Sequence, residues 1–333
     1  MIGCGYWGPN LIRNFSQIDS TELYYVCDLD ESKMISAKKT YPSVKTTSNF
    51  MDVINDPQVD AVVIALPVAK HYPIAKEALL NGKHVLLEKP MTASSAEAEE
   101  LIKIAAEKNL TLMVDHTFEY SQPIRMIKEI ISKGDLGDIY YMRADWLNLG
   151  LLQPDVNVIW DLATHVISII NFVSGMIPEK VSANGGGYIR DDIPEVANLH
   201  IKYAGGARAY ATVSWVEPKK TRSLTIVGSK KMLVYDLMNE EEPIKIYDKG
   251  VDLTKEIENP DQHRIDYRYG DVYSPNVKNI EPLKTMCQHF ANCVLGGDKP
   301  ISDGLSGLNV VKVLEFSEES LKRGEEISLN DQG

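Results

Sequence analysis

The stretch Gly3-Cys4-Gly5-Tyr6-Trp7-Gly8 matches the pattern G-x-G-x-x-G, in which spaced glycines permit a tight turn from a strand into a helix. In such a turn the backbone can approach a pyrophosphate, which then lies at the N-terminus of the helix. Ordinary glycine turns also match the pattern, so its context decides. Residues 9–15 have helical character and follow directly. The stretch therefore predicts a phosphate-binding turn that opens a doubly wound α/β domain.

A carboxylate follows the glycine turn at the sequence spacing that is typical of a dinucleotide-binding domain. The strand-like run 23–27 ends at Asp28, which is twenty residues after Gly8. A carboxylate at this place binds the hydroxyls of the adenosine ribose, although a solvated residue at a strand end is the plain alternative. Asp28 would repel a 2'-phosphate, and Leu29 and Asp30 supply no cation to receive one. The spacing thus predicts NAD as the cofactor, in preference to NADP.

Short apolar runs alternate with helical segments as far as residue 114. The strand-like runs are 23–27, 61–65, 85–87 and 112–114, and the helical segments between them include 72–80 and 95–108. This order is typical of a parallel sheet. Only Met1 and Ile2 precede the first glycine, so the usual first strand is nearly missing. We predict a Rossmann domain over residues 1–118.

The pattern changes after residue 120. A helix is expected at 122–133, a strand at 139–147 and a helix at 160–174, followed by strand-like pieces at 181–183, 197–203, 207–215, 223–227, 232–235 and 244–247. Short turns favour antiparallel hairpins. Residues 119–333 are therefore predicted to form an α+β domain with a large, mainly antiparallel open sheet. Helices at 281–295 and 302–322 are expected to pack back on the N-terminal domain, and Ala211, Val213 and Trp215 to leave the open sheet face partly apolar.

Composition narrows the classes of function. The chain has 333 residues, 44% hydrophobic and 25% charged, which fits two folded domains. A net charge of -12 disfavours nucleic acid and favours a small-molecule substrate. No apolar run reaches the ~20 residues of a membrane span. The four cysteines have no metal-binding spacing with histidine, so we expect reduced thiols, a cytoplasmic location and no metal site.

Three segments resemble the Gfo/Idh/MocA oxidoreductases, a family that includes glucose-fructose oxidoreductase and inositol dehydrogenase. They are residues 3–10, residues 65–67 with His71, and residues 82–90, which end in Glu88-Lys89-Pro90. The resemblance implies an NAD-dependent dehydrogenase in which Lys89 lies beside the nicotinamide and the reacting hydroxyl. A lysine at the carboxyl end of a buried strand also lies where α/β sheets bind ligands. The alternative is a surface lysine with its ammonium in water.

The resemblance extends to the residues around Lys89. Glu88 is expected to position the loop and the cofactor, and Pro90 often follows a cis bond in family members. Leu66 and Pro67 are expected near the nicotinamide and its ribose. His71 either joins this cofactor site or caps the helix that begins near residue 72.

A second catalytic element is expected at residues 160–165, which resemble the family's D-x-x-x-H motif. Asp161 and His165 are four residues apart, so a helix places both on one face. In this interpretation His165 is the base, Asp161 orients the substrate or His165, and Lys89 polarises the hydroxyl. Family members are thought to divide these roles in different ways, and the sequence leaves that division open.

Four further stretches resemble the branch of the family that acts on nucleotide-linked sugars: 141–150, 155–157, 215–222 and 267–273. They imply hydride removal from a secondary alcohol, most plausibly at C3 of a UDP-N-acetylamino sugar. Lys219 and Arg222 either meet the diphosphate or belong to a solvated basic turn. The competing functions are an inositol or free-polyol dehydrogenase and a silent NAD-binding sensor. Family members commonly cover the open sheet with another subunit, which implies a homodimer or homotetramer.

Overall fold

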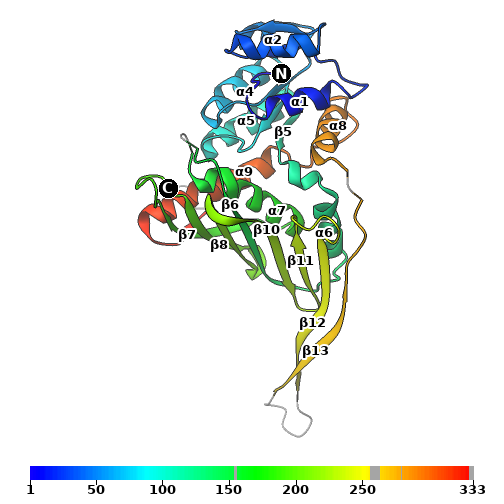
Figure 1. Cartoon of the computed structure of the whole chain (residues 1–333), viewed down its shortest axis with the longest axis vertical. Coiled ribbons are helices and arrows are strands. Elements are labelled where there is room, and N and C mark those ends of the chain that lie inside the picture. The colour runs from blue at the N-terminus through cyan, green and yellow to red at the C-terminus, as the bar shows by residue number, and fades with distance from the viewer. Residues whose placement is uncertain (154–155, 256–262, 279, 330–333) are drawn as a thin grey trace. The chain divides into compact units, whose positions relative to one another are not determined.

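The computed structural model describes residues 1–153, 156–255, 263–278 and 280–329, and the chain divides into two compact units (Figure 1). The first unit contains residues 1–121 and 280–315, and the second contains residues 122–279 and 316–333. The first unit therefore receives α8 (Pro282–Val294) and the first part of α9 (Gly304–Arg323). The predicted fold class is confirmed: a parallel Rossmann sheet is followed along the chain by a large, mainly antiparallel sheet.

The first unit is built on parallel strands joined by helices. Its strands are β1 (Tyr25–Cys27), β2 (Lys45–Thr47), β3 (Ala61–Ile64), β4 (His84–Glu88) and β5 (Leu112–Asp115). Its connecting helices are α1 (Gly8–Phe15), α2 (Glu31–Thr40), α3 (Phe50–Asn55), α4 (His71–Leu80) and α5 (Ser95–Lys108). The middle residues of β3, β4 and β5 are buried and apolar, as expected for a parallel sheet with both faces covered.

One residue joins the two parts of this sheet. β1 and β2 form one pair, β3, β4 and β5 form a triplet, and Ile2 bridges Cys27 and Ile64 between them. The Ile2 N–H donates to Val63 O at 2.8 Å, and the Ala65 N–H donates to Ile2 O at 2.9 Å. Ile2 thus occupies the place between β1 and β3 in this sheet.

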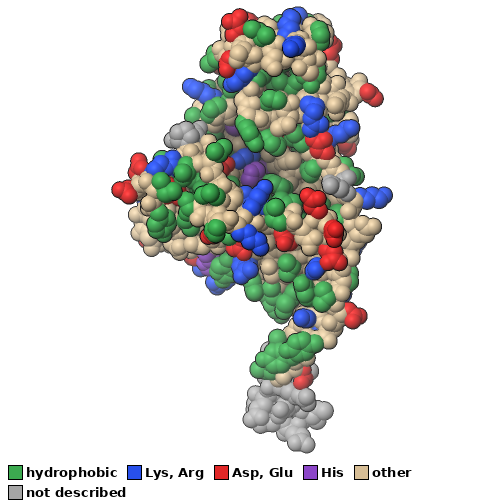
Figure 2. All heavy atoms as spheres, in the orientation of Figure 1, with side chains coloured by type: hydrophobic (Ala, Val, Ile, Leu, Met, Phe, Trp, Pro, Cys, Tyr) green, Lys and Arg blue, Asp and Glu red, His purple; other side chains and the backbone are tan. Residues whose placement is uncertain are grey.

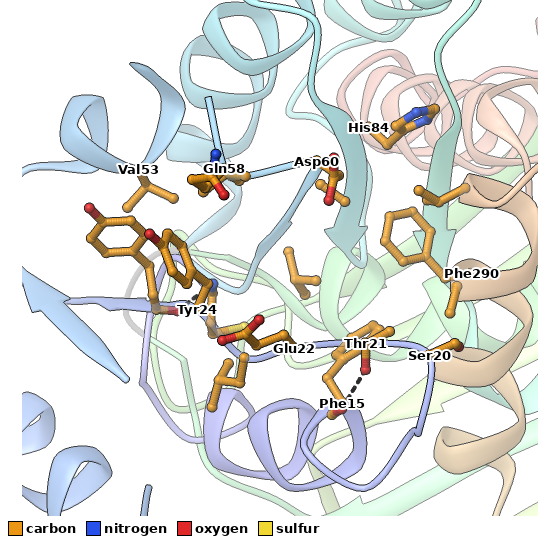
Figure 3. Close-up of a pocket in the computed structure, with 18 of the residues that line it drawn as sticks. Phe15, Ser20, Thr21, Glu22, Tyr24, Val53, Gln58, Asp60, His84 and Phe290 are labelled. Carbon is orange, nitrogen blue, oxygen red and sulfur yellow. Dashed lines mark hydrogen bonds between the residues drawn. The ribbon is translucent and has the colours of Figure 1, made fainter. Parts of the chain in front are cut away.

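A cavity of about 460 Å³ lies beside this joint (Figure 3). Met1, Tyr24, Ala61, His84 and Phe290 are among the residues that line it. Tyr25, Ala61 and His84 are the first residues of β1, β3 and β4. The cavity is thus at the amino ends of the strands, whereas α/β sheets bind ligands at the carboxyl ends.

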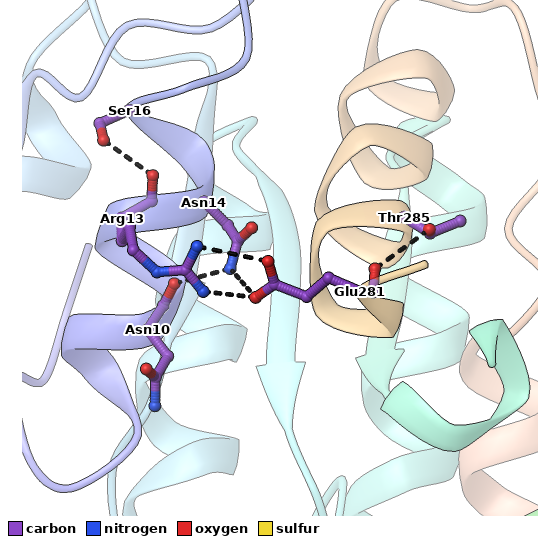
Figure 4. A network of polar contacts seen from close by, with 6 residues as sticks. All are labelled: Asn10, Arg13, Asn14, Ser16, Glu281 and Thr285. Atoms are coloured by element: carbon purple, nitrogen blue, oxygen red, sulfur yellow. Dashed lines mark hydrogen bonds and ion pairs between the residues drawn. The ribbon is translucent and has the colours of Figure 1, made fainter. Parts of the chain in front are cut away.

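Helix α8 is fixed to α1 by a polar network (Figure 4). The Glu281 carboxylate accepts hydrogen bonds from both terminal nitrogens of Arg13 and from Asn14 Nδ2, the last at 3.3 Å. Beside this network the rings of Phe15 and Phe290 meet edge to face, with centroids 6.1 Å apart. These contacts hold the helix that follows the glycine turn in place from a distant part of the chain.

The second unit contains a nine-stranded sheet in the order β13-β12-β11-β10-β6-β9-β8-β7-β14. The strands are β6 (Ile139–Leu149), β7 (Pro178–Gly186), β8 (Val196–Tyr203), β9 (Arg208–Ser214), β10 (Val216–Gly228), β11 (Met232–Asp236), β12 (Ile244–Lys255), β13 (His263–Tyr273) and β14 (Ile327–Ser328). Among its described strands, only β6 and β9 pair in parallel. Two helices, α6 (Gln122–Ser132) and α7 (Thr164–Ser174), pack against each other.

The two faces of this sheet differ in polarity. Helix α7 packs on one face, where its Val166, Ile169 and Ile170 adjoin Ala144 and Trp146 of β6. Residues of the opposite, helix-free face include Tyr141, Arg143, Asn198 and Tyr210, all exposed.

The expectation that Ala211, Val213 and Trp215 leave the open face apolar is wrong. All three side chains are no more than 2% exposed. Ala211 and Val213 alternate with the outward Tyr210 and Thr212, so they point to the helix-covered side. The periodicity identified a strand with one apolar face but could not say which face the helices cover.

Several elements were not predicted, namely α2, β2, α3, β13 and β14. β12 is also much longer than the expected run 244–247. Over the residues with a described position, none of the helices is long and apolar enough to cross a membrane.

Candidate active site

The glycine turn has the shape of an anion cradle. A Cβ on Gly3 would lie 2.3 Å from Ala65 O, and one on Gly8 would lie 2.6 Å from Gly3 O, so both positions require glycine. A Cβ on Gly5 would meet nothing within 4 Å, which makes this the open side of the turn. Helix α1 begins at Gly8 with no side-chain cap and no acidic residue in its first turn. Its N-terminal N–H groups therefore suit a pyrophosphate.

Asp28 is held beside this turn. Its Oδ2 accepts the Cys4 N–H at 2.6 Å, and its Oδ1 accepts the Asp30 N–H at 2.9 Å. The carboxylate is thus fixed at the carboxyl end of β1. Lys33 Nζ lies 3.8 Å from Asp28 Oδ1 and 3.9 Å from Asp30 Oδ2. The sequence interpretation missed this nearby cation because Lys33 belongs to α2, which was not predicted.

Lys89 follows directly on β4, and its bond to Pro90 is cis, as the family resemblance implies. His71 is fully buried, and its ring nitrogens lie 2.9 Å from Pro90 O and 2.7 Å from Leu66 O. Burial lowers the pKa of His71, so the ring is neutral at pH 7. The proposed capping role is wrong, since no side chain caps α4. His71 instead ties the Leu66-Pro67 loop to the segment after Lys89.

Glu88 and Asp115 form a buried carboxyl pair at the ends of two neighbouring strands. Burial and the Asp115 charge raise the pKa of Glu88 well above its usual range, and burial also raises the pKa of Asp115, so the pair disfavours two negative charges. Glu88 Oε2 accepts the Lys89 N–H at 3.2 Å. Asp115 accepts hydrogen bonds from Thr117 Oγ1 and from Trp7 Nε1, the latter at 3.4 Å. The pair thereby links the glycine turn to the segment that carries Lys89.

His116 is a polar residue that the sequence interpretation missed. It follows β5 and is only 1% exposed, and within the described part of the chain neither ring nitrogen has a hydrogen-bond partner. Burial, followed by the charge of Lys89, lowers the pKa of His116 to about 3. A neutral imidazole is therefore available to a ligand near Lys89. Its place just past a strand's carboxyl end was the only signal in the sequence.

In the second unit, Asp161 and His165 lie where a π-helical turn (Ile159–Ala163) runs into α7. Asp161 Oδ2 accepts a hydrogen bond from Trp215 Nε1 at 3.0 Å. The His165 ring is tilted against Trp146, with centroids 6.3 Å apart. The predicted helix is thus a π-helix at Asp161, which is wider than an α-helix. Trp215 contacts Asp161, and Trp146 contacts His165.

Arg222 joins the same cluster. Its guanidinium lies 5.0 Å from the centre of the Trp146 ring, and its Nη1 donates to Leu147 O at 2.9 Å and to Thr221 O at 2.8 Å. Burial lowers the pKa of Arg222 to about 10, and the charge of Asp161 opposes that shift. Arg222 Nη2 also donates to Asn148 Oδ1. Arg222 therefore brings a buried positive charge to the neighbourhood of Asp161 and His165.

The remaining predicted site residues are not gathered in this cluster. Lys219 is exposed on β10, with none of the contacts that hold Arg222. Asp155 lies outside the described residues. Among those that are described, no group of three or more His, Cys, Asp or Glu side chains has the arrangement of a metal site.

The chain resembles known proteins along most of its length. Residues 1–116 match the model of the oxidoreductase family with an NAD-binding Rossmann fold, and residues 124–234 match the GFO/IDH/MocA C-terminal domain. The chain is 24% identical to a scyllo-inositol 2-dehydrogenase (NADP(+)) from Bacillus subtilis, with 98% of this chain and 94% of the relative covered. It is 23% identical to a UDP-N-acetylglucosamine 3-dehydrogenase from Acidithiobacillus ferrooxidans, with 93% of each covered.

Solved structures show the same fold. The WlbA dehydrogenase from Bordetella pertussis, in complex with NADH and UDP-GlcNAcA, superposes with a TM-score of 0.80 at 20% identity over 99% of this chain and 98% of that one. The chain belongs to the GFO/IDH/MocA family of oxidoreductases, has its NAD-binding Rossmann fold, and is an NAD(P)-dependent dehydrogenase that acts on CH–OH groups.

Proposed function

We propose that this enzyme oxidises a secondary alcohol of a nucleotide-linked sugar, at C3 of a UDP-N-acetylamino sugar. The observation that carries the proposal is the buried guanidinium of Arg222, which lies in the cluster with Asp161 and His165. A positive charge held there suits an anionic substrate and gives a neutral inositol or polyol no comparable partner. In this proposal the second unit, starting near residue 119, binds the substrate.

For the cofactor, we propose that the backbone from Gly3 to Gly8, including Tyr6 and Trp7, holds the pyrophosphate of NAD. Asp28 holds the adenosine ribose, and two carboxylates beside the single Lys33 keep that end of the site unfavourable for a 2'-phosphate. Leu66, Pro67, His71, Glu88 and Lys89 form the nicotinamide end. His116 supplies a further hydrogen-bonding group there. Bound NAD supplies the hydride acceptor.

The chain's own residues then handle the proton and the developing charge. His165 accepts the proton of the substrate hydroxyl, and Asp161, held by the Trp215 indole, orients that pair. Lys89 donates a hydrogen bond to the same oxygen as negative charge builds on it. The raised pKa of Glu88 disfavours a negative charge beside the Lys89 ammonium, and the neutral ring of His116 adds none.

The experiment that tests this function is NADH formation on a panel of UDP-sugars, dTDP-sugars and inositols. UDP-N-acetylamino sugars should react with the highest kcat/KM. Arg222→Met should raise KM for the UDP-sugar by at least 10-fold, whereas Lys219→Met, on the exposed part of β10, should change it little. Faster turnover of inositols than of every nucleotide sugar would instead establish the polyol dehydrogenase. Binding of NAD with no oxidation of any alcohol would favour the silent sensor.

We also propose that the chain forms a homodimer or homotetramer through the helix-free face of its sheet. That face is largely polar but carries the exposed aromatic rings of Tyr141 and Tyr210, which pack edge to face with centroids 6.2 Å apart. Tyrosines of this kind are common in subunit interfaces.

A further inference from the structure

The strands β12 and β13 extend beyond the sheet as a two-stranded ribbon (Figure 1). β12 pairs with β11 only from Ile244 to Tyr247. From Lys249 onward its partner is β13 alone, in a register that runs from Lys249 opposite Tyr269 to Lys255 opposite His263. We call residues 248–255 and 263–271 the arm. An isolated two-stranded ribbon is at best marginally stable in water, so the arm needs support from elsewhere.

One face of the arm is charged, and its charged side chains form ion pairs with one another. Arg268 Nε lies 3.2 Å from Asp248 Oδ1, and its Nη1 lies 2.7 Å from Asp252 Oδ2. Two glycines make room for these groups. A Cβ on Gly250 would lie 2.4 Å from Arg268 Nη2, and a Cβ on Gly270 would lie 2.6 Å from Asp248 Oδ2. The ion pairs are therefore built into the ribbon and leave this face suited to water.

The other face of the arm is mainly apolar and exposed, and it also carries Lys249, which pairs with Tyr269. Cross-strand partners point to the same side, which groups Val251 with Tyr267, and Ile265 and Tyr269 follow on that side. Their exposed fractions are 51% for Val251, 57% for Ile265, 66% for Tyr267 and 78% for Tyr269. Figure 2 shows hydrophobic side chains gathered on this ribbon. A contiguous exposed apolar surface of this kind marks an interaction site.

This apolar face continues the helix-free face of the sheet. β12 alternates regularly, with Ile244 and Ile246 buried and Lys245 and Tyr247 on the other side. Lys249 and Val251 follow in the same alternation as Tyr247. The extra residue in the register lies on β13, between Tyr269 and Val272, and leaves the alternation of β12 intact. The arm therefore extends the face that carries Tyr141 and Tyr210.

We propose that the arm clasps a second copy of this chain, its apolar face packed on the helix-free sheet face of that copy. This deepens the self-association proposed above and is independent of the substrate. If each of the four side chains buries on the order of 100 Å², two arms in a reciprocal two-fold contact bury on the order of 1,600 Å² in total, the usual size of a stable interface. One arm on an unrelated protein would bury about half of that, the size of a weak contact.

The test compares the association of the wild-type enzyme with that of Tyr267→Asp/Tyr269→Asp in sedimentation velocity. We expect a wild-type species of at least twice the 37.2 kDa chain mass, and at least a 100-fold higher dissociation constant for the arm variant. Ile35→Asp/Leu295→Asp places the same charges on exposed apolar residues of the first unit and should associate like the wild type. An unchanged circular dichroism spectrum and an unchanged melting temperature show that both units of each variant are folded.

A second measurement locates the contact without adding charge. The native cysteines are buried, so a cysteine placed at Tyr269 and another at Tyr210 are the accessible thiols. Mixing Tyr269→Cys chains with Tyr210→Cys chains and adding a short bis-maleimide should give the mixed cross-linked pair. An arm variant that keeps the wild-type dissociation constant, or no mixed cross-link, would overturn the clasp. If Tyr141→Asp/Tyr210→Asp dissociates while the arm variant does not, self-association stands and the clasp alone is wrong. A wild-type enzyme that is monomeric at micromolar concentration would overturn both the proposed self-association and the proposed contact of the arm.

Discussion

Asp161 Oδ2 accepts a hydrogen bond from the indole Nε1 of Trp215 at 3.0 Å, which anchors the carboxylate ahead of His165 to the end of a sheet strand. The donor comes from a buried side chain, only 1% exposed, so water cannot readily replace it. The position of Asp161 is thus set by the sheet as well as by its own helical turn.

Trp215→Phe should therefore impair catalysis without impairing NAD binding. The substitution removes the donor and keeps most of the ring, and a hydrogen bond to a charged group contributes ~1.5–3 kcal/mol, or roughly 10- to 100-fold in rate. The measurement is kcat with saturating sugar, alongside NAD affinity by fluorescence titration. Tyr203→Phe is the control, because it removes another buried hydrogen bond of the same unit, from Tyr203 to Asn171 Oδ1 at 2.8 Å, and it should leave kcat nearly unchanged. An unchanged kcat in Trp215→Phe would show that Asp161 does not depend on this anchor.

Lys89→Ala and His165→Ala should each lower the rate of hydride transfer by ~100-fold or more, the usual scale for a lost charge-stabilising or proton-accepting group. NAD affinity should change little. Asp161→Asn should lower the rate of hydride transfer less than these two substitutions if Asp161 only orients its neighbours. Single-turnover NADH formation with bound NAD and saturating substrate isolates this step. Near-native single turnover in His165→Ala would assign the proton to Lys89 or Asp161.

Asp28→Ala should weaken NAD binding and reduce the preference for NAD over NADP, because it removes the carboxylate at the ribose end of the site. Lys33→Ala is the informative partner variant, since Lys33 is the cation near Asp28. It should leave NAD binding nearly unchanged and weaken NADP further. Both cofactors are titrated by fluorescence against each variant. Tighter NADP than NAD binding by the wild type would contradict the role given to Asp28.

Glu88→Gln should change how stability depends on pH. The folded-state pKa of Glu88 is raised above its unfolded value, so its contribution is complete below the unfolded pKa of ~4.3 and is lost as pH rises through the folded pKa. Glutamine keeps the shape and cannot ionise. The free energy of unfolding of the variant minus that of the wild type should therefore be more positive at pH 8 than at pH 5. Urea unfolding at the two pH values measures this, and an equal difference at both would show a normal Glu88 pKa.

The sequence predicted those helices and strands whose apolar residues recur with a strong period. The run 95–108 became α5 with the same bounds, because Ser94 caps its start and Asn109 ends it in the left-handed region. Helix α2 was missed because none of its residues is buried, so no apolar stripe exists to detect. β13 was missed because its apolar residues face solvent in the arm.

The candidate site was predictable only where a motif carried it. Two sequence motifs predicted candidate catalytic residues directly. One is the four-residue spacing of Asp161 and His165, and the other is the run that ends in Lys89. The indole of Trp215, the imidazole of His116 and the cation of Lys33 reach their places through the packing of distant segments. No local pattern records such contacts, and the same reason explains why the covered face of β9 was assigned to the wrong side.

Helix α2 begins two residues after Asp28's neighbour Leu29, and none of its side chains is buried. A segment with few buried contacts opens locally at a lower free energy than the rest of its unit. Amides of α2 should therefore exchange with solvent sooner than those of α5, which buries Ala98, Leu101, Ile104 and Ala105. A cofactor that binds Asp28 would oppose this opening, so NAD should slow hydrogen exchange in α2.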